Sequence, residues 1–240
     1  ILFIDEENSF INTEEFAATV KGSDNYFVLI TRENLYNLPY SVEEIYGLRS
    51  SGKYQNTRKV YQQTYQIYSR VQQFPVKPKK LLLEDSNSGY EFFKAVSEAA
   101  GRECQSAGGK SNLLKALKDT EPEEICVIAD GAAIGPEMNG LYQKIQKNPN
   151  IKLYLPESFE WIILNARILE EKEIQEILQN PEAYIDSKEY FSWERYFTKL
   201  LIEKTEGTYL QYKKATLNET YLHEKNKRKI LQSMKGIDFS

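Results

Sequence analysis

Two apolar runs that end in acidic residues decide the expected fold: Leu81-Leu82-Leu83-Glu84-Asp85 and Ile125-Cys126-Val127-Ile128-Ala129-Asp130. Short continuous apolar runs of this kind predict strands of a parallel sheet that is covered on both faces. Helical patterns follow the two runs, over Tyr90 to Ala100 and from about Pro136 to Gln146, and a further strand is expected over Lys152 to Leu155. Residues 80–156 are therefore expected to form an α/β domain.

Shorter elements complete this domain. Ser88 is the expected cap of the helix that begins near Tyr90, because a serine hydroxyl can accept a hydrogen bond from the first helical turn. A short strand around Glu103 to Gln105 is expected to lead into the turn Ser106-Ala107-Gly108-Gly109-Lys110, and a helix is expected over Asn112 to Lys118. The domain thus alternates strands with helices.

The first 48 residues predict a smaller β-α-β unit. Ile1 to Ile4 is expected to be a buried strand ending in Asp5-Glu6, and Thr13 is the expected cap of a helix that extends to Lys21. A second strand is expected over Tyr26 to Ile30. Because the chain opens inside an apolar run, we expect that a longer polypeptide precedes Ile1.

Charge is concentrated between the two α/β parts. The chain carries a formal net charge of −4, yet residues 49–80 hold eight Lys and Arg and no Asp or Glu, interleaved with four tyrosines. Cations bind phosphates and aromatic rings stack on bases, so this block, at the end of which Pro75 and Pro78 mark a boundary, predicts a nucleic-acid contact. The predicted nucleic-acid-binding residues are Arg49, Lys53, Tyr54, Arg58, Lys59, Tyr61, Arg70 and Lys110. The alternative is a solvated hairpin, over about Val60 to Val71, whose tyrosines pack on a core.

Residues 157–240 are expected to be helical, over 158–169, 171–179, 192–203 and 209–234, and to offer a surface for a protein partner or for self-association. No apolar run approaches the roughly 20 residues needed to cross a bilayer, so no membrane contact is expected. Two cysteines, Cys104 and Cys126, do not make a disulfide framework, which favours a reducing, cytoplasmic location. His223 is the single histidine, which excludes a zinc site built from several histidines.

Glu84 and Asp130 are the expected catalytic pair. Acids that follow adjacent parallel strands meet at the same edge of the sheet, where α/β proteins place their sites. Carboxylate oxygens suit Mg²⁺, and a divalent ion can activate a nucleophile and stabilise the charge of a phosphoryl transition state. Asp130, Glu84 and Asp85 are the expected metal ligands. The competing interpretation is that these acids merely end strands where the chain reaches the surface.

The order of these features over about Lys80 to Leu155 resembles the TOPRIM domain of primases, topoisomerases and OLD-type nucleases. The resemblance implies that Glu84 is a general acid/base or metal ligand, that Asp130 is the principal Mg²⁺ ligand, and that Gly108 to Lys110 is the central turn. That family carries Asp-x-Asp after the later strand, whereas this chain has Ala132 at the second position. Asp85 or Glu137 would have to supply the lost carboxylate.

The opening Ile1-Leu2-Phe3-Ile4-Asp5-Glu6 resembles the Walker B strand of P-loop ATPases. The resemblance implies that Asp5 helps to hold Mg²⁺ and that Glu6 polarises a water molecule. The phosphate-binding loop G-x-x-x-x-G-K-[ST] is absent from these 240 residues, so ATP is expected only if such a loop lies upstream.

Three functions follow from these patterns. The first is a nucleic-acid-binding hydrolase, a Mg²⁺-dependent nuclease of TOPRIM-like type attached to a P-loop ATPase-like region. The second is a non-catalytic module, with a degenerate site, that binds DNA, RNA or protein. The third is an ATPase whose nucleotide-binding loop lies outside this chain.

Overall fold

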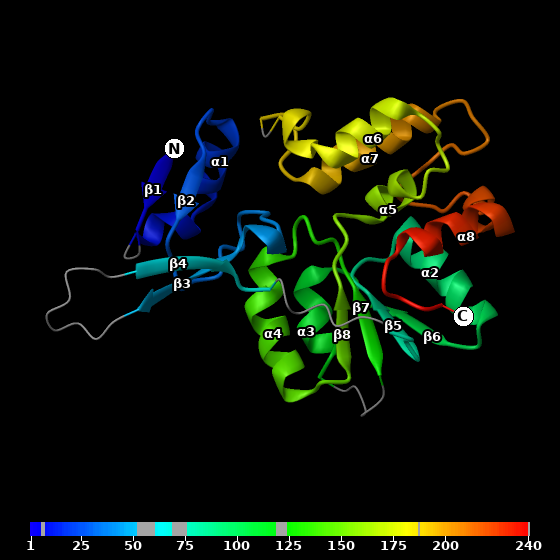
Figure 1. Cartoon of the computed structure of the whole chain (residues 1–240), viewed down its shortest axis with the longest axis horizontal. Coiled ribbons are helices and arrows are strands. Elements are labelled where there is room, and N and C mark those ends of the chain that lie inside the picture. Colours follow the sequence, from blue (N-terminus) through cyan, green and yellow to red (C-terminus); the bar gives the residue numbers. More distant parts are fainter. Residues whose placement is uncertain (6–7, 52–60, 69–75, 119–123, 187, 240) are drawn as a thin grey trace, which may run out of the picture.

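The computed structural model describes residues 1–5, 8–51, 61–68, 76–118, 124–186 and 188–239. It is a mixed α/β structure with a parallel four-stranded sheet and, in these ranges, eight α-helices. In Figure 1 a small N-terminal unit lies to one side of the sheet, and the C-terminal helices gather near one end of it. None of the described helices has the length and apolar character needed to cross a membrane.

The central sheet contains strands β5 (Lys80–Leu83), β6 (Glu103–Ser106), β7 (Ile125–Ile128) and β8 (Ile151–Tyr154). They are parallel and lie in the order β6-β5-β7-β8. The predicted strands of this domain are therefore confirmed, each within a residue or two of the expected bounds. The central pair is β5 and β7, so the two runs that end in Glu84 and Asp130 are neighbours.

Both faces of this sheet are covered, as the apolar runs predicted. Leu81, Leu82 and Leu83 are all at most 4% exposed, although successive side chains of a strand point to opposite faces. Leu81 and Leu83 pack beneath helix α2 (Ser88–Ala99) and the C-terminal helices, whereas Leu82 packs beneath α3 (Leu113–Ala116) and α4 (Met138–Lys147). Two hydrophobic cores therefore hold the sheet from opposite sides.

Helix α2 begins earlier than predicted, and Ser88 is not its cap. Asn87 takes the N-cap position without a side-chain hydrogen bond, and Ser88 is the first helical residue. The Ser88 hydroxyl lies 2.7 Å from the Tyr212 hydroxyl instead, and its backbone N–H donates to the carbonyl of Lys214 at 2.9 Å. A segment more than 120 residues later in the chain thus satisfies the end of this helix.

The N-terminal unit contains β1 (Leu2–Ile4), α1 (Glu14–Gly22) and β2 (Phe27–Leu29), and the two strands pair in parallel as expected. Thr13 caps α1, because its hydroxyl accepts from the Phe16 N–H at 3.1 Å. The prediction of a buried first strand is wrong, since Phe3 is 71% exposed. Only one face of this two-stranded sheet, the side of Ile4 and Leu29, packs on a core among the described residues.

Two antiparallel strands form a hairpin at the start of the basic block: β3 (Tyr46–Ser51) and β4 (Tyr61–Gln66). The block of residues 49–80 contains all of β4 and the second half of β3. Strand β3 had no counterpart in the prediction. The strand pattern expected over 60–71 is confirmed from Tyr61 to Gln66, whereas residues 60 and 69–71 lie outside the described residues. Tyr68 packs on the core shared with α4, with its ring 5.6 Å from that of Tyr142. For this tyrosine, the alternative of core packing is correct.

The C-terminal region contains α5 (Phe159–Asn165), α6 (Lys172–Gln179), α7 (Trp193–Thr205) and α8 (Glu224–Ser233). The expected helix over 209–234 is wrong in its first half, because residues 209–218 form a non-helical segment followed by the short turn η6 (Glu219–Leu222). Gly207 adopts a positive φ of 68°, which ends the preceding helix. Beyond α8, the backbone of Val76 exchanges two hydrogen bonds with that of Gly236 and Asp238, each 2.8 Å long.

Candidate active site

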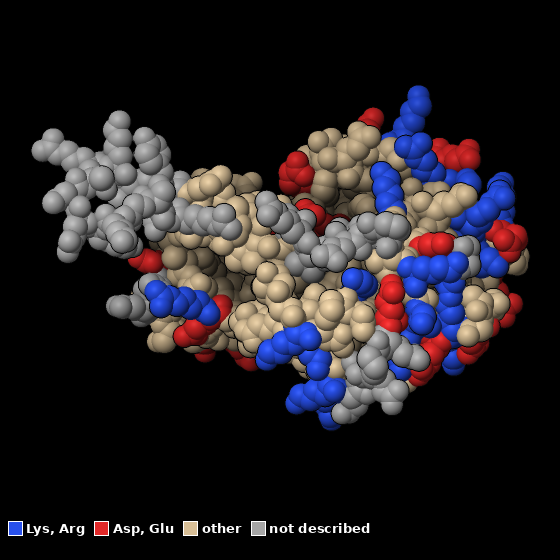
Figure 2. All heavy atoms as spheres, turned by 60° about the horizontal axis from the view of Figure 1, so that its bottom comes forward, with Lys and Arg blue, Asp and Glu red and all other residues tan. Residues whose placement is uncertain are grey.

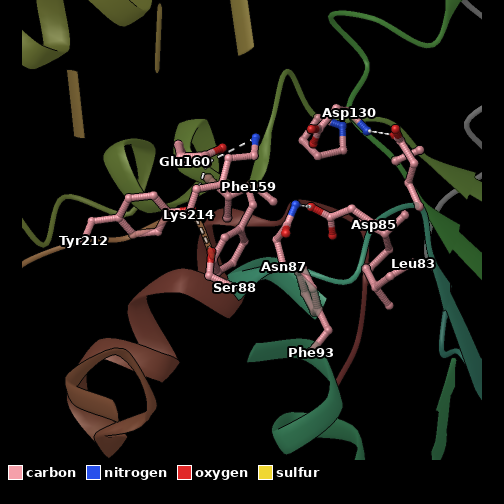
Figure 3. Close-up of a pocket in the computed structure, with 16 residues that line it drawn as sticks. Leu83, Asp85, Asn87, Ser88, Phe93, Asp130, Phe159, Glu160, Tyr212 and Lys214 are labelled. Atoms are coloured by element: carbon pink, nitrogen blue, oxygen red, sulfur yellow. Dashed lines mark hydrogen bonds and ion pairs between the residues drawn. The ribbon is translucent and has the colours of Figure 1, made fainter. Parts of the chain in front are cut away.

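A small pocket lies at the carboxyl ends of β5 and β7 (Figure 3). It encloses about 30 Å³, which is room for a water molecule or an ion. The walls come from the ends of the two strands, the first turns of α2 and α5, and the non-helical segment that carries Tyr212 and Lys214. This is the edge at which acids were predicted to converge.

The pairing of β5 with β7 explains why Glu84 and Asp130 meet. Leu83 is in register with Ile128, so the residues that follow the two strands leave the sheet side by side. The Glu84 N–H donates to the Ile128 carbonyl at 3.0 Å, and the Glu84 Oε2 accepts from the Asp130 N–H, also at 3.0 Å. The structure therefore brings the two predicted catalytic residues into direct contact.

Both carboxyl groups hold their protons more tightly than usual. Burial raises the pKa of Glu84 to about 7, and the charges of Glu194 and Asp85 add to this effect against the Asp130 N–H and Lys110, which lower it. Burial also raises the pKa of Asp130 well above its usual range, together with the charges of Glu194 and Glu84. A buried carboxyl with a pKa near 7 suits general acid–base chemistry at neutral pH.

Asp85 lies in the same pocket but is bound differently. Its Oδ2 accepts from the Asn87 side-chain amide at 2.9 Å, as Figure 3 shows. Burial raises the pKa of Asp85, whereas the hydrogen bond from Asn87 and the charge of Lys214 lower it. Asp85 therefore belongs to the pocket, with one carboxylate oxygen already engaged by the turn that starts α2.

Four further residues of this site were missed by the sequence reasoning: Glu160, Glu194, Tyr212 and Lys214. Glu160 is only 2% exposed, and its Oε1 accepts from the Tyr212 hydroxyl at 2.8 Å. The Lys214 Nζ lies 3.6 Å from the same oxygen and forms an ion pair with Glu194. The pocket therefore combines a cluster of carboxylates with one fixed cation.

Tyr212 and Lys214 were missed because residues 209–234 were expected to form one helix. Residues two apart in sequence lie on different faces of a helix but on the same face of an extended segment. The side chains of Tyr212 and Lys214 both line the pocket. Gly207, as a helix-ending residue, was the sequence feature that could have revealed the break. Glu160 is hidden for another reason: nothing in a single helical pattern distinguishes a buried acid from a solvated one.

Asn218 shapes this segment. Its side-chain amide donates to the carbonyls of Tyr209 and Gln211, both at 3.0 Å, while its Oδ1 accepts from the Thr220 N–H at 3.0 Å. The Tyr212 N–H donates to the Thr205 hydroxyl at 2.9 Å, which fixes the residue that reaches Glu160.

We expect Asn218→Ala to lower the free energy of unfolding by about 1–3 kcal/mol, because it leaves backbone carbonyls without their donor. Urea unfolding monitored by circular dichroism measures this change. Asn180→Ala is a matched control, since Asn180 is an exposed N-cap without a side-chain capping bond. Equal stabilities of the two variants would contradict the assignment of this role to Asn218.

The other predicted residues are placed as follows. The Lys110 Nζ donates to the carbonyl of Ala133 at 2.9 Å, beside the pocket, so it binds the loop that follows Asp130. Ala132 is buried, at 5% exposure, and as an alanine it offers no carboxylate at the position of the second acid. Glu137, considered as a substitute ligand, is buried and does not line the pocket. Asp5 is an exposed residue at the end of β1, also away from the pocket.

Most of the predicted nucleic-acid contacts lie outside the described residues: Lys53, Tyr54, Arg58, Lys59 and Arg70, and so does Glu6. Arg49 lies in β3 opposite Gln63, and Tyr61 lies at the start of β4 opposite Ser51. On the face shown in Figure 2, the described Lys and Arg side chains are mixed with acidic ones over much of the sheet and C-terminal helices. The nucleic-acid interface thus stays a prediction.

The donor set can be compared with what Mg²⁺ requires. Within the described ranges, no group of three or more His, Cys, Asp or Glu side chains is placed to hold a metal ion together. Mg²⁺ usually takes only one or two protein carboxylates and keeps several waters. Glu84 and Asp130 offer two adjacent carboxylates whose mutual repulsion a cation would relieve. The chemistry of this carboxylate pair fits one Mg²⁺ ion.

Comparisons of the chain with protein-family models, with curated proteins and with solved structures give no match. The chemistry of this site is therefore inferred from the geometry of the pocket.

Proposed function

We propose that this chain is a nucleic-acid-binding hydrolase that cleaves phosphodiester bonds with Mg²⁺, through a TOPRIM-like site next to a P-loop ATPase-like region. The observation that carries the proposal is the contact between Glu84 and Asp130 at the ends of adjacent parallel strands. The basic block of residues 49–80 supports a nucleic-acid substrate.

In the proposed reaction, Glu84 accepts the proton of the water that attacks phosphorus, since its pKa of about 7 lets it exchange a proton at neutral pH. The bond from phosphorus to the leaving oxygen breaks, and this oxygen takes a proton from solvent. Asp130 would hold Mg²⁺ together with water ligands, and the ion would supply charge stabilisation at the phosphoryl oxygens. The positive charge of Lys214 offsets part of the negative charge of Glu160 and Glu194, which reduces the net negative charge around the pocket. Tyr212 orients Glu160 by donating its hydroxyl proton.

The direct test is incubation of the whole chain with labelled single-stranded and double-stranded DNA and RNA in Mg²⁺ or Mn²⁺. Metal-dependent shortening of one of these substrates is expected. Absence of cleavage with every substrate and both metals would remove the nuclease proposal.

The pH dependence of cleavage provides a sharper test. Glu84 must be deprotonated to act as a base, so we expect the rate at low Mg²⁺ to rise with pH and to level off above about 7. Raising Mg²⁺ should move this midpoint to lower pH, because a nearby cation favours the carboxylate. Glu84→Gln should abolish the rise, whereas Glu103→Gln, on an exposed position of β6, should keep it. An unchanged profile in Glu84→Gln would assign the base to another residue.

A second function is favoured by Ala132. Because this buried alanine replaces the second acid of the TOPRIM pattern, the site could bind nucleic acid without cutting it. Binding that weakens steeply with salt, with no product after long incubation, would favour this module over the hydrolase. Binding that ignores charge reversal at Arg58, Lys59 and Arg70 would contradict both.

A further inference from the structure

The loop of residues 131–135, which follows Asp130, is held by partners from three directions. Gly131 and Ala132 donate their N–H groups to the carbonyls of Pro156 and Glu157, at 2.5 and 3.3 Å. Lys110 donates to the Ala133 carbonyl from the turn after β6. These contacts come from within the sheet domain and hold the loop from two sides.

The third side is held by residues 40–44, which we call the strap. The Val42 N–H donates to the Gly131 carbonyl at 3.2 Å, and the Gly135 N–H donates to the Tyr40 carbonyl at 3.0 Å. The strap lies so close that a Cβ atom on Gly135 would come within 2.4 Å of the Tyr40 carbonyl oxygen. Backbone therefore touches backbone at both ends of the loop.

The strap connects two hydrophobic cores. Tyr40 packs against the core of the N-terminal unit, whereas Val42, and Ile45 directly after the strap, pack against the core beneath α3 and α4. The Ser41 hydroxyl and the Glu44 carboxylate form a capping box, which stiffens the turn η2 (Val42–Glu44). A displacement of the N-terminal unit would thus pull directly on the Gly131 carbonyl.

We propose that the strap positions the loop after Asp130, so that the N-terminal unit controls the alignment of the Glu84–Asp130 pair. The contact at stake is the hydrogen bond from the Asp130 N–H to Glu84, one residue before the peptide that the strap holds. The effect on cleavage rests on the proposed function, whereas the mechanical coupling does not.

Val42→Pro tests the proposal by deleting one hydrogen bond. Val42 is the first residue of η2, a position that accepts proline, and Ser41 has the extended backbone that a residue before proline needs (φ −69°, ψ 150°). Val42→Ala is the matched control, because it trims the same side chain and keeps the N–H donor.

Hydrogen exchange of the backbone amides is the first readout. In Val42→Pro, the Asp130 N–H is expected to exchange about tenfold faster than in Val42→Ala, with α2 and α8 unchanged, because one anchoring bond of the loop is lost. Binding of Mn²⁺ alone, followed by electron paramagnetic resonance, should weaken by a similar factor. Equal Asp130 exchange in the two variants would overturn the proposal.

Gly135→Ala, with Gly140→Ala as its control, provides a second pair if proline prevents folding. The added methyl group meets strap backbone at position 135 but only the end of the Leu114 side chain at position 140. Faster exchange of the Asp130 N–H in Gly135→Ala but not in Gly140→Ala supports the positioning role of the strap. This result holds even if the wild-type chain cleaves no substrate, because absence of cleavage refutes only the hydrolase proposal. Unchanged exchange in both glycine variants would refute the strap while leaving the hydrolase open.

Discussion

Asp130→Ala is expected to reduce metal-dependent cleavage by about 10²–10⁴-fold while the protein remains folded. The substitution removes a carboxylate from the pocket but keeps the backbone N–H that binds Glu84. Initial rates on the best substrate, with Asp130→Asn as the variant closest in shape, measure the loss. Cleavage at the wild-type rate in both variants would place the chemistry elsewhere.

Asp130→Ala is also expected to be more stable than the wild type at pH 8. The pKa of Asp130 is raised in the folded state, so its ionisation opposes folding as the pH rises from the unfolded pKa towards the folded one. Well below the unfolded pKa of about 3.9 the carboxyl is protonated in both states, so the pH-dependent part of the stability difference should disappear. Urea midpoints at about pH 3 and pH 8 check this sign, and an advantage of the variant that fails to grow between these two values would contradict it.

Lys214→Met is expected to have the largest effect on stability, about 3 kcal/mol, because it leaves Glu160 buried without its cation. The Lys214 Nζ contacts both Glu160 and Glu194, and without it the donor that remains to Glu160 among the described residues is the Tyr212 hydroxyl, at 2.8 Å. The methionine keeps the length of the side chain, so the change tests charge more than packing. Urea unfolding at neutral pH provides the measurement.

The neighbouring Lys213→Met is the control, since Lys213 is exposed and is expected to contribute less than about 0.5 kcal/mol. Adding Glu160→Gln to Lys214→Met should recover part of the loss, because the buried charge is then removed with its partner. If Lys214→Met and Lys213→Met were equally stable, Lys214 would have no structural role in the pocket.

The sheet domain could be predicted because the local sequence of each strand indicates both its burial and its end. Three consecutive buried leucines require a sheet covered on both faces, and acids directly after two such strands indicate one edge. Glu84 and Asp130 meet because β7 lies beside β5 in the sheet. The alternation of strands and helices in the sequence is typical of a sheet in which such strands are parallel neighbours. The convergence of this pair is the part of the site that the sequence predicted.

The rest of the site depends on contacts far apart along the chain. Tyr212 and Ser88 are 124 residues apart, and no local pattern encodes their hydrogen bond. The hydrophobicity of the first strand predicted that it could be buried, but not which side chains would cover it, and the described residues leave Phe3 exposed. Likewise, the cap expected at Ser88 was displaced because tertiary contacts replaced the local one.

The paired backbones of Val76 and Ile237 also fix the residues that follow α8. The Phe239 ring stacks on that of Phe93 in α2, with the ring centroids 6.1 Å apart. Phe93 itself lines the pocket. The residues after α8 therefore support the helix that forms one wall of the pocket, so a substitution there is expected to reach the site through α2.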